Sequence, residues 1–164
     1  MIDLLAELKT SARLRLNVVR RQDVADRSEA LRLKDCLNHV ARDAGFTHWD
    51  HARRVLGGQA VPGDDMGRFW HAPGCNRMLN QWFANETQAR AAHAADPGAF
   101  LLPYGRQFIL AQDDFVRELG LDPADPAWTT IHRDLVRGYG TTGWEALAWQ
   151  RLVAQRGTSP PQRL

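Results

Sequence analysis

The spacing of apolar residues changes once along the chain, and this change divides it into two sections that are expected to fold differently. Up to about Leu56 the apolar residues recur every three or four positions, which is the pattern of amphipathic helices. The segment Gln59–Gly67 contains Pro62, Gly63 and two adjacent aspartates, which are typical of a linker or exposed loop. Beyond it, short apolar runs alternate with turn residues, as in segments that contain strands. We therefore expect an α+β protein.

Three helices are expected in the first section, residues 1–58. The second begins near Ser28 and Arg32-Leu33 and ends at Gly45, a residue that suits a helix C-terminus. The third takes Thr47 as its N-cap and ends at Gly57-Gly58. The residues expected to face the core are Leu4, Leu5, Leu8, Ala12, Leu16 and Val19 in the first helix, Ala30, Leu33, Leu37, Val40 and Ala44 in the second, and Trp49, Ala52 and Leu56 in the third.

After a linker over residues 59–67, the section 68–157 has the order β-β-α-β-β followed by helices. The expected strands are Arg68–His71, Met78–Ala84, Phe100–Leu102 and Phe108–Leu110, the last two joined as a β-hairpin. Asn85 with Gln88 resembles a capping box, which opens the helix Glu86–Ala95. These strands predict a small, mostly antiparallel sheet.

Three C-terminal helices are expected to follow the sheet. They cover Asp114–Leu119, Pro126–Gly138 and Gly143–Gln155. Asp125 is the expected cap of the middle helix, and Pro126 suits its first position. The expected inward residues are Trp128, Ile131 and Leu135 in the middle helix and Trp144, Leu147 and Ala148 in the last. Residues 158–164 contain two adjacent prolines and are expected to form a disordered tail.

The composition excludes several classes of protein. The chain of 164 residues is 44% hydrophobic and 24% charged, which is ordinary for a globular protein. No run approaches the roughly 18 apolar residues of a membrane helix. The first residues lack the basic start and apolar core of a signal peptide, and the two cysteines, Cys36 and Cys75, fit a reducing compartment. We expect a cytoplasmic protein that does not bind membranes.

The basic residues are mostly arginine, since Lys9 and Lys34 are the only lysines among 21. GC-rich codon usage produces such a bias and suggests a bacterial source. Residues 1–60 hold 11 basic and 8 acidic side chains, whereas residues 61–164 hold 10 and 11. The arginines of the first helix that could form a strip facing phosphates are Arg13, Arg15, Arg20 and Arg21. Because the net charge is only +2, a protein partner is favoured slightly over a nucleic acid.

The segment Val40–Thr47 resembles the first helix and turn of the helix-turn-helix of bacterial repressors. That family has a small residue in the first helix and a glycine four positions on, as Ala41 and Gly45 are here. In the second helix the family's two buried apolar positions fall on His51 and Arg54. The apolar residues are instead Trp49, Ala52, Val55 and Leu56, so the helix is rotated relative to a repressor's recognition helix.

Residues 30–57 also resemble a short helical module of some glyoxalase-related and mobile-element-encoded proteins of unassigned function. In that module a leucine-rich helix leads into alanine, three residues, glycine-phenylalanine, two residues and tryptophan. The matching residues are Ala41, Gly45-Phe46 and Trp49. The resemblance implies a helical packing module without catalytic residues, in which Phe46 and Trp49 belong to the core.

His71 and Cys75 lie four residues apart across a Pro-Gly turn, which could bring an imidazole and a thiolate to one zinc ion. A structural zinc needs a second such pair, and none follows, since His93 and His132 are isolated; His48 and His51 give at most half a site. We therefore expect no metal and no cofactor. Cys75, exposed after the turn, could instead be a nucleophile with His71 or His132 as its base, although no family signature surrounds it.

Aromatic residues and arginines alternate in the second section. The aromatic residues are Trp70, Trp82, Phe83, Tyr104 and Phe108, and the arginines are Arg68, Arg77 and Arg106. A sheet face with such residues could stack bases or bind an anionic group, or the tryptophans could form the core between sheet and helices. The candidate binding residues are Arg53, Arg54, Arg68, Arg77, Tyr104 and Arg106.

The sequence favours a non-catalytic, cytoplasmic binding or regulatory protein that acts through a macromolecular surface. One alternative is a small cysteine- or metal-dependent hydrolase that uses His71, Cys75 and His132. A second alternative is a DNA-binding protein of the helix-turn-helix kind. Without a working recognition helix, any nucleic-acid binding by this chain is expected to be weak and dependent on salt.

Overall fold

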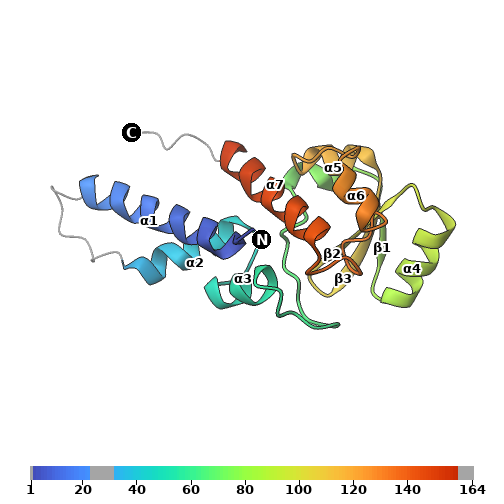
Figure 1. The fold of residues 1–164 in the computed structure, drawn as a ribbon, viewed down its shortest axis with the longest axis horizontal. Helices are drawn as coiled ribbons and strands as arrows, with labels where there is room; N and C mark the ends of the chain where they lie inside the picture. The colour runs from blue at the N-terminus through green and yellow to red at the C-terminus, as the bar shows by residue number, and fades with distance from the viewer. Residues whose placement is uncertain (1, 23–31, 159–164) are drawn as a thin grey trace. The chain divides into compact units, whose positions relative to one another are not determined.

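The structure is a computed structural model that describes residues 2–22 and 32–158 (Figure 1). The chain forms two compact units, one over Asp3–Ala60 and one from Val61 onward. The expected α+β class is confirmed, because three helices precede a three-stranded antiparallel sheet and further helices. No helix in the two described stretches is long and apolar enough to cross a membrane.

The first unit consists of α1 (Leu4–Gln22), α2 (Leu33–Asp43) and α3 (Trp49–Leu56). The apolar stripe of α1 is confirmed, and its buried residues are Leu4, Leu8, Ala12 and Leu16. The α1–α2 contact is an apolar cluster of Ala12, Leu16, Cys36 and Val40, with Leu37 packed against it. Leu33 was expected in this core but is exposed.

The ends of α2 and α3 differ from the expected ones. Ser28 and Ala30 lie outside the described residues, and α2 begins at Leu33. Thr47 is not the N-cap of α3. His48 takes that place, since its Nδ1 accepts a hydrogen bond from the main-chain nitrogen of His51 at 3.0 Å. Trp49, expected in the core, is only half-buried.

The turn between α2 and α3 is made by Gly45, whose φ of 102° is a left-handed conformation that favours glycine. The main-chain nitrogen of the next residue, Phe46, donates back to the oxygen of Ala41 at 2.9 Å. The turn thereby places Phe46 in the core, as expected.

The sheet of the second unit contains β1 (Gln81–Phe83), β2 (Phe100–Tyr104) and β3 (Gln107–Ala111) in the order β1-β3-β2. The predicted hairpin is confirmed as β2 and β3, which pair antiparallel. Helix α4 (Glu86–Ala95) covers one face of the sheet, and the contact residues include Ala89, Leu101 and Leu110. Figure 1 shows α4 on one side of the strands and α5, α6 and α7 on the other.

The strand expected over Arg68–His71 is absent, because these residues form a turn. The main-chain nitrogen of His71 donates to the oxygen of Arg68 at 3.2 Å and closes the turn. Phe69 and Trp70 are 0% and 1% exposed. Successive residues of a strand point to opposite faces, so a turn is needed to bury both rings in one core. The short 3-10 helix η1 (Pro73–Arg77) follows, and β1 is shorter than expected.

The C-terminal helices are α5 (Asp113–Glu118), α6 (Pro126–Thr130) and α7 (Thr142–Thr158). Asp125 caps α6 as expected, accepting from the nitrogen of Ala127 at 2.8 Å. The prediction that this helix continues to Gly138 is wrong. His132 and Arg133 have φ values of 54° and 55°, outside the helical region, and they end the helix early. The expected core residues are buried: Trp128, Ile131, Leu135, Trp144, Leu147 and Ala148. Residues 159–164, the greater part of the expected disordered tail, lie outside the described residues.

Candidate functional site

Three side chains of the second unit, those of Arg68, His71 and Trp82, contact the ring of Tyr104, and we call these four residues the Tyr104 cluster. The ring of Trp82 meets that of Tyr104 edge to face, with centroids 5.0 Å apart. The ring of His71 does the same, also at 5.0 Å. The guanidinium carbon of Arg68 lies 5.5 Å from the centroid of the Tyr104 ring, a cation–π distance.

The register of the sheet explains why Trp82 and Tyr104 share a face. Trp82 is paired with Ile109, and Tyr104 is paired with Gln107. Residues two apart on β3 point to the same side, and this is the side opposite Leu110, which packs toward α4. The two rings therefore lie on the sheet face away from α4, and the turn after Gly67 brings Arg68 and His71 to that face.

The cluster is open to solvent on the side of β1. Trp82 is 47% exposed and Leu79, just before β1, is 99% exposed. Within the described part of the chain no strand pairs with the outer edge of β1, so its main-chain groups there lack a partner strand. The outer edge of β2 differs, because the nitrogen of Leu101 donates to the oxygen of Arg133 and the nitrogen of Leu135 donates to the oxygen of Leu101, both at 2.9 Å. The sheet thus has one open edge, beside the cluster.

The predicted binding residues are divided between the two units. Arg68 and Tyr104 meet in the cluster. Arg106 is exposed in the β2–β3 turn, two residues beyond Tyr104, and Arg77 is exposed at the end of η1. Arg53 and Arg54 lie in the other unit, on α3, as exposed residues. The aromatic residues also divide, since Trp70 belongs to the core whereas Trp82 is at the surface.

His71 is a half-buried member of the cluster, between the rings of Tyr104 and Phe115. Burial lowers the pKa of His71, and the positive charges of Arg68 and Arg151 lower it further. The imidazole is therefore neutral at pH 7. A neutral ring can pack edge to face with Tyr104 beside Arg68 without repelling the guanidinium.

Cys75 is not exposed, contrary to expectation, because η1 turns its side chain inward and leaves it 1% exposed. Burial raises the pKa of the Cys75 thiol, although a hydrogen bond from the main chain at Ala72 opposes this, and the nearby charges of Glu118 and Asp114 also raise it. The group is a thiol rather than a thiolate at neutral pH, and the thiolate is the nucleophilic form.

The three candidate catalytic residues do not form a catalytic arrangement. Among the described residues, no hydrogen bond joins the side chains of His71, Cys75 and His132 to one another. His132 is exposed in the turn after α6, and the ring of His71 contacts Tyr104 and Phe115 instead. Within residues 2–22 and 32–158, these three side chains are therefore not joined as a nucleophile hydrogen-bonded to its base.

Arg151 of α7 binds the turn that carries Arg68 and His71. This residue was not singled out from the sequence. It is buried, and its guanidinium donates to the main-chain oxygens of Phe69 at 3.0 Å and of His71 and Leu119 at 2.9 Å each. Burial lowers the pKa of Arg151 to about 10, so the group keeps its charge at neutral pH. Arg151 therefore fixes the turn that carries Arg68 and His71.

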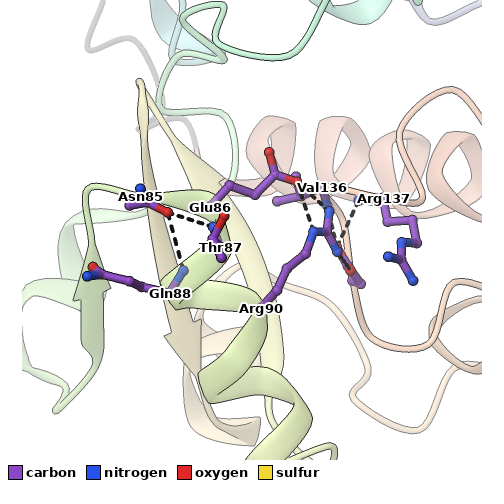
Figure 2. Close-up of polar contacts among 8 residues, drawn as sticks. Asn85, Glu86, Thr87, Gln88, Arg90, Val136 and Arg137 are labelled. Carbon is purple, nitrogen blue, oxygen red and sulfur yellow. Dashed lines mark hydrogen bonds and ion pairs between the residues drawn. The ribbon is translucent and has the colours of Figure 1, made fainter.

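A second polar network holds α4 in place (Figure 2). Arg90 donates to Glu86 of its own helix and reaches Oδ2 of the buried Asp134 at 2.7 Å. The other oxygen of Asp134 accepts from the main-chain nitrogens of Val136 at 2.9 Å and Arg137 at 2.8 Å. Figure 2 also shows Asn85 capping α4 through Thr87 and Gln88, as predicted. This network connects α4 to residues 134–137 and is structural.

The donor atoms for a metal ion are scattered. Over residues 2–22 and 32–158, no three side chains of His, Cys, Asp or Glu gather in a way that could hold a metal ion. His48 and His51, the pair on the third helix, use their Nδ1 atoms within the helix start, where His48 caps α3 and His51 accepts from the nitrogen of Thr47.

Comparison with known proteins returns no match, since no protein-family model, curated protein or solved structure is detectably similar to this chain. The function must therefore be inferred from the chain's own residues.

Proposed function

We propose that this is a non-catalytic binding protein that takes a partner protein at the Tyr104 cluster and the adjoining open edge of β1. The observation that carries the proposal is Trp82, a large ring held edge to face against Tyr104 while 47% of it stays exposed. Tryptophan, tyrosine and arginine are the residues that most often dominate protein–protein binding energies. A fixed ring also loses little conformational entropy when a partner covers it.

A protein suits this surface better than a nucleic acid does. Unpaired main-chain groups along a strand edge can hydrogen-bond an added peptide strand. A nucleic acid cannot match the alternating N–H donors and C=O acceptors of such an edge. The fully exposed aliphatic side chain of Leu79 lies next to that edge and offers apolar contact area. Residues 61–164 also carry 11 acidic against 10 basic side chains, which gives phosphates no general attraction.

The hydrolase alternative has less support. Its nucleophile would be Cys75, whose thiol is buried and protonated at neutral pH. The histidine nearest in sequence, His71, packs its ring against Tyr104 and Phe115. Neither side chain is arranged to attack a substrate from solvent.

Site-specific photo-crosslinking tests the proposal. A photoreactive amino acid replaces Leu79 in the full chain, and a matched chain carries it at Ala91, an exposed position on α4. After irradiation in the native host, position 79 should give a discrete adduct that protease removes and nuclease does not. Trp82→Ala in the same chain should abolish that adduct.

Three results would contradict the proposal: equal adducts from positions 79 and 91, an adduct that nuclease removes, or no adduct at position 79. The first would mean that crosslinking is unspecific. The second would make the partner a nucleic acid. The third would mean that this surface is not occupied.

A further inference from the structure

We propose a second binding site, in the first unit: the α1 basic face, formed by Lys9, Arg13 and Arg20, which binds the phosphate backbone of double-stranded DNA. This site is independent of the Tyr104 cluster, which belongs to the other unit.

The geometry of an α-helix brings these three side chains onto one face. Each residue turns the helix by about 100°, so positions 9, 13 and 20 lie within about 40° of one another, and they span about 16 Å along the axis. All three are exposed, because the apolar stripe of α1 faces α2 instead. A DNA duplex carries one charge per about 1.7 Å of its axis, so a line of cations of this length can reach several phosphates.

Among the residues that the structure describes, no carboxylate pairs with the α1 basic face. Lys9 to Gln22 contains five basic residues and no acidic one. Of the five, Arg15 points elsewhere, with its guanidinium 3.3 Å from Asp43 of α2. No described carboxylate forms an ion pair with Lys9, Arg13 or Arg20.

The described acidic residues of this unit are concentrated at helix N-termini or in other ion pairs. Asp3 accepts from the nitrogen of Ala6 at the start of α1, and Asp35 accepts from that of Arg32 at the start of α2. Asp50, in the first turn of α3, pairs with Arg53 at 3.2 Å. The segment 23–31, which contains three further acidic residues, lies outside the described residues, and Lys9 and Arg13 are the members of the face farther from it in sequence.

DNA is favoured over an anionic membrane for this face. A helix that lies in a membrane surface inserts a broad apolar face, whereas the apolar stripe of α1 is buried against α2. Only Leu14 and Val18 remain as large exposed apolar residues within α1. The cations therefore lack the apolar partner face that membrane insertion needs.

Helix α3, which occupies the place of a repressor's recognition helix, is a weaker candidate than α1. Its first turn carries the exposed Asp50, whose charge repels phosphates, and this residue already pairs with Arg53. Contacts from α1 to phosphates alone would position the protein without reading base sequence. We therefore expect binding that is independent of sequence and sensitive to salt.

Fluorescence anisotropy tests the site with the full chain and a labelled duplex of about 20 base pairs, titrated from about 50 to about 200 mM salt. Lys9→Gln with Arg13→Gln should weaken binding at low salt and reduce the slope of log K against log salt by about 1.8, since each phosphate contact contributes about 0.9. The matched control removes the same charge from the second unit, by Arg117→Gln with Arg137→Gln. Binding by the control should stay as in the parent chain. Glutamine is a good helix former, and circular dichroism checks that α1 persists.

Several outcomes would overturn the proposal. Equal loss in both double variants would mean that only net charge matters. No binding of the parent chain at low salt, or tighter binding of the corresponding single strand, would exclude a duplex site. Binding to vesicles with phosphatidylserine, lost in the same double variant and without duplex binding, would make the surface a membrane site. Trp82→Ala should leave duplex binding unchanged. The duplex-binding test and the crosslinking test can therefore fail independently of each other.

Discussion

Arg151 donates a hydrogen bond from Nη2 to the main-chain oxygen of His71 at 2.9 Å, which connects the last helix to the turn of the Tyr104 cluster. The two residues are 80 positions apart in the sequence. The same guanidinium also donates to the main-chain oxygens of Phe69 and Leu119, so one buried side chain binds three carbonyl oxygens.

Arg151→Met should destabilise the protein by about 3 kcal/mol, because each buried group left unpaired costs about 1–3 kcal/mol and removal of a buried charge offsets part of the loss. Urea unfolding followed by circular dichroism measures the change. Arg137→Met, at an exposed position, is the control and should change stability by less than about 0.5 kcal/mol. Equal midpoints for the two variants would contradict the structural role of Arg151.

Trp70 and Trp82 should respond differently to truncation. Trp70→Ala removes a ring that is 1% exposed and should cost about 3–5 kcal/mol. Trp82→Ala removes a half-exposed ring, and we expect a loss of about 1 kcal/mol, mainly its aromatic pair with Tyr104. Thermal unfolding of both variants checks this, and a larger loss for Trp82 would place that ring in the core.

Neither Cys75 nor Cys36 should react readily in the folded protein. Both thiols are 1% exposed, and the pKa of Cys75 is raised by burial. A chromogenic disulfide reagent at neutral pH should therefore modify both only in concentrated guanidinium chloride. Rapid modification of Cys75 in the native protein, absent in Cys75→Ser, would favour the hydrolase alternative.

His71 should make stability depend on pH below neutrality. Burial and the charges of Arg68 and Arg151 lower its pKa in the folded state, so the unfolded chain binds the proton more readily. Stability therefore falls as pH drops through the unfolded value of about 6.5 and levels off only below the folded value. In His71→Gln, stability should therefore change less between pH 7 and pH 5 than it does in the parent chain.

The control for that experiment is His132→Gln, which removes an exposed histidine from the turn after α6. Urea midpoints are compared at several pH values for the three chains. Parallel curves for His71→Gln and the parent chain would show that protonation of His71 is not coupled to folding.

Elements whose signals are local could be predicted from the sequence. Asn85 caps α4 by accepting from the nitrogens two and three residues ahead, and Asp125 caps α6 by accepting from the nitrogen two residues ahead. The apolar residues of α1 recur at helical spacing within one helix, so its buried stripe could also be predicted. Each of these features depends on residues close together in the chain.

Features set by distant residues could not be predicted. The apolar run at Phe69 and Trp70 looks like a strand, and it forms a turn because both rings enter one core and Arg151 binds the turn's oxygens. Likewise α6 ends early because the main chain at Arg133 bonds to Leu101 of β2. The cluster combines residues from a turn and two strands. Arg68, Trp82 and Tyr104 could be expected on a common sheet face, whereas the sequence suggested His71 only as a zinc ligand or a base.

The closed edge of β2 limits how copies of this sheet can join. Within the described residues, the main chain of Arg133 and Leu135 occupies that edge at Leu101, so another strand can be added only beside β1. A filament built edge to edge needs two open edges on every copy. If two copies met through β1, both open edges would be used, and growth would stop at the pair.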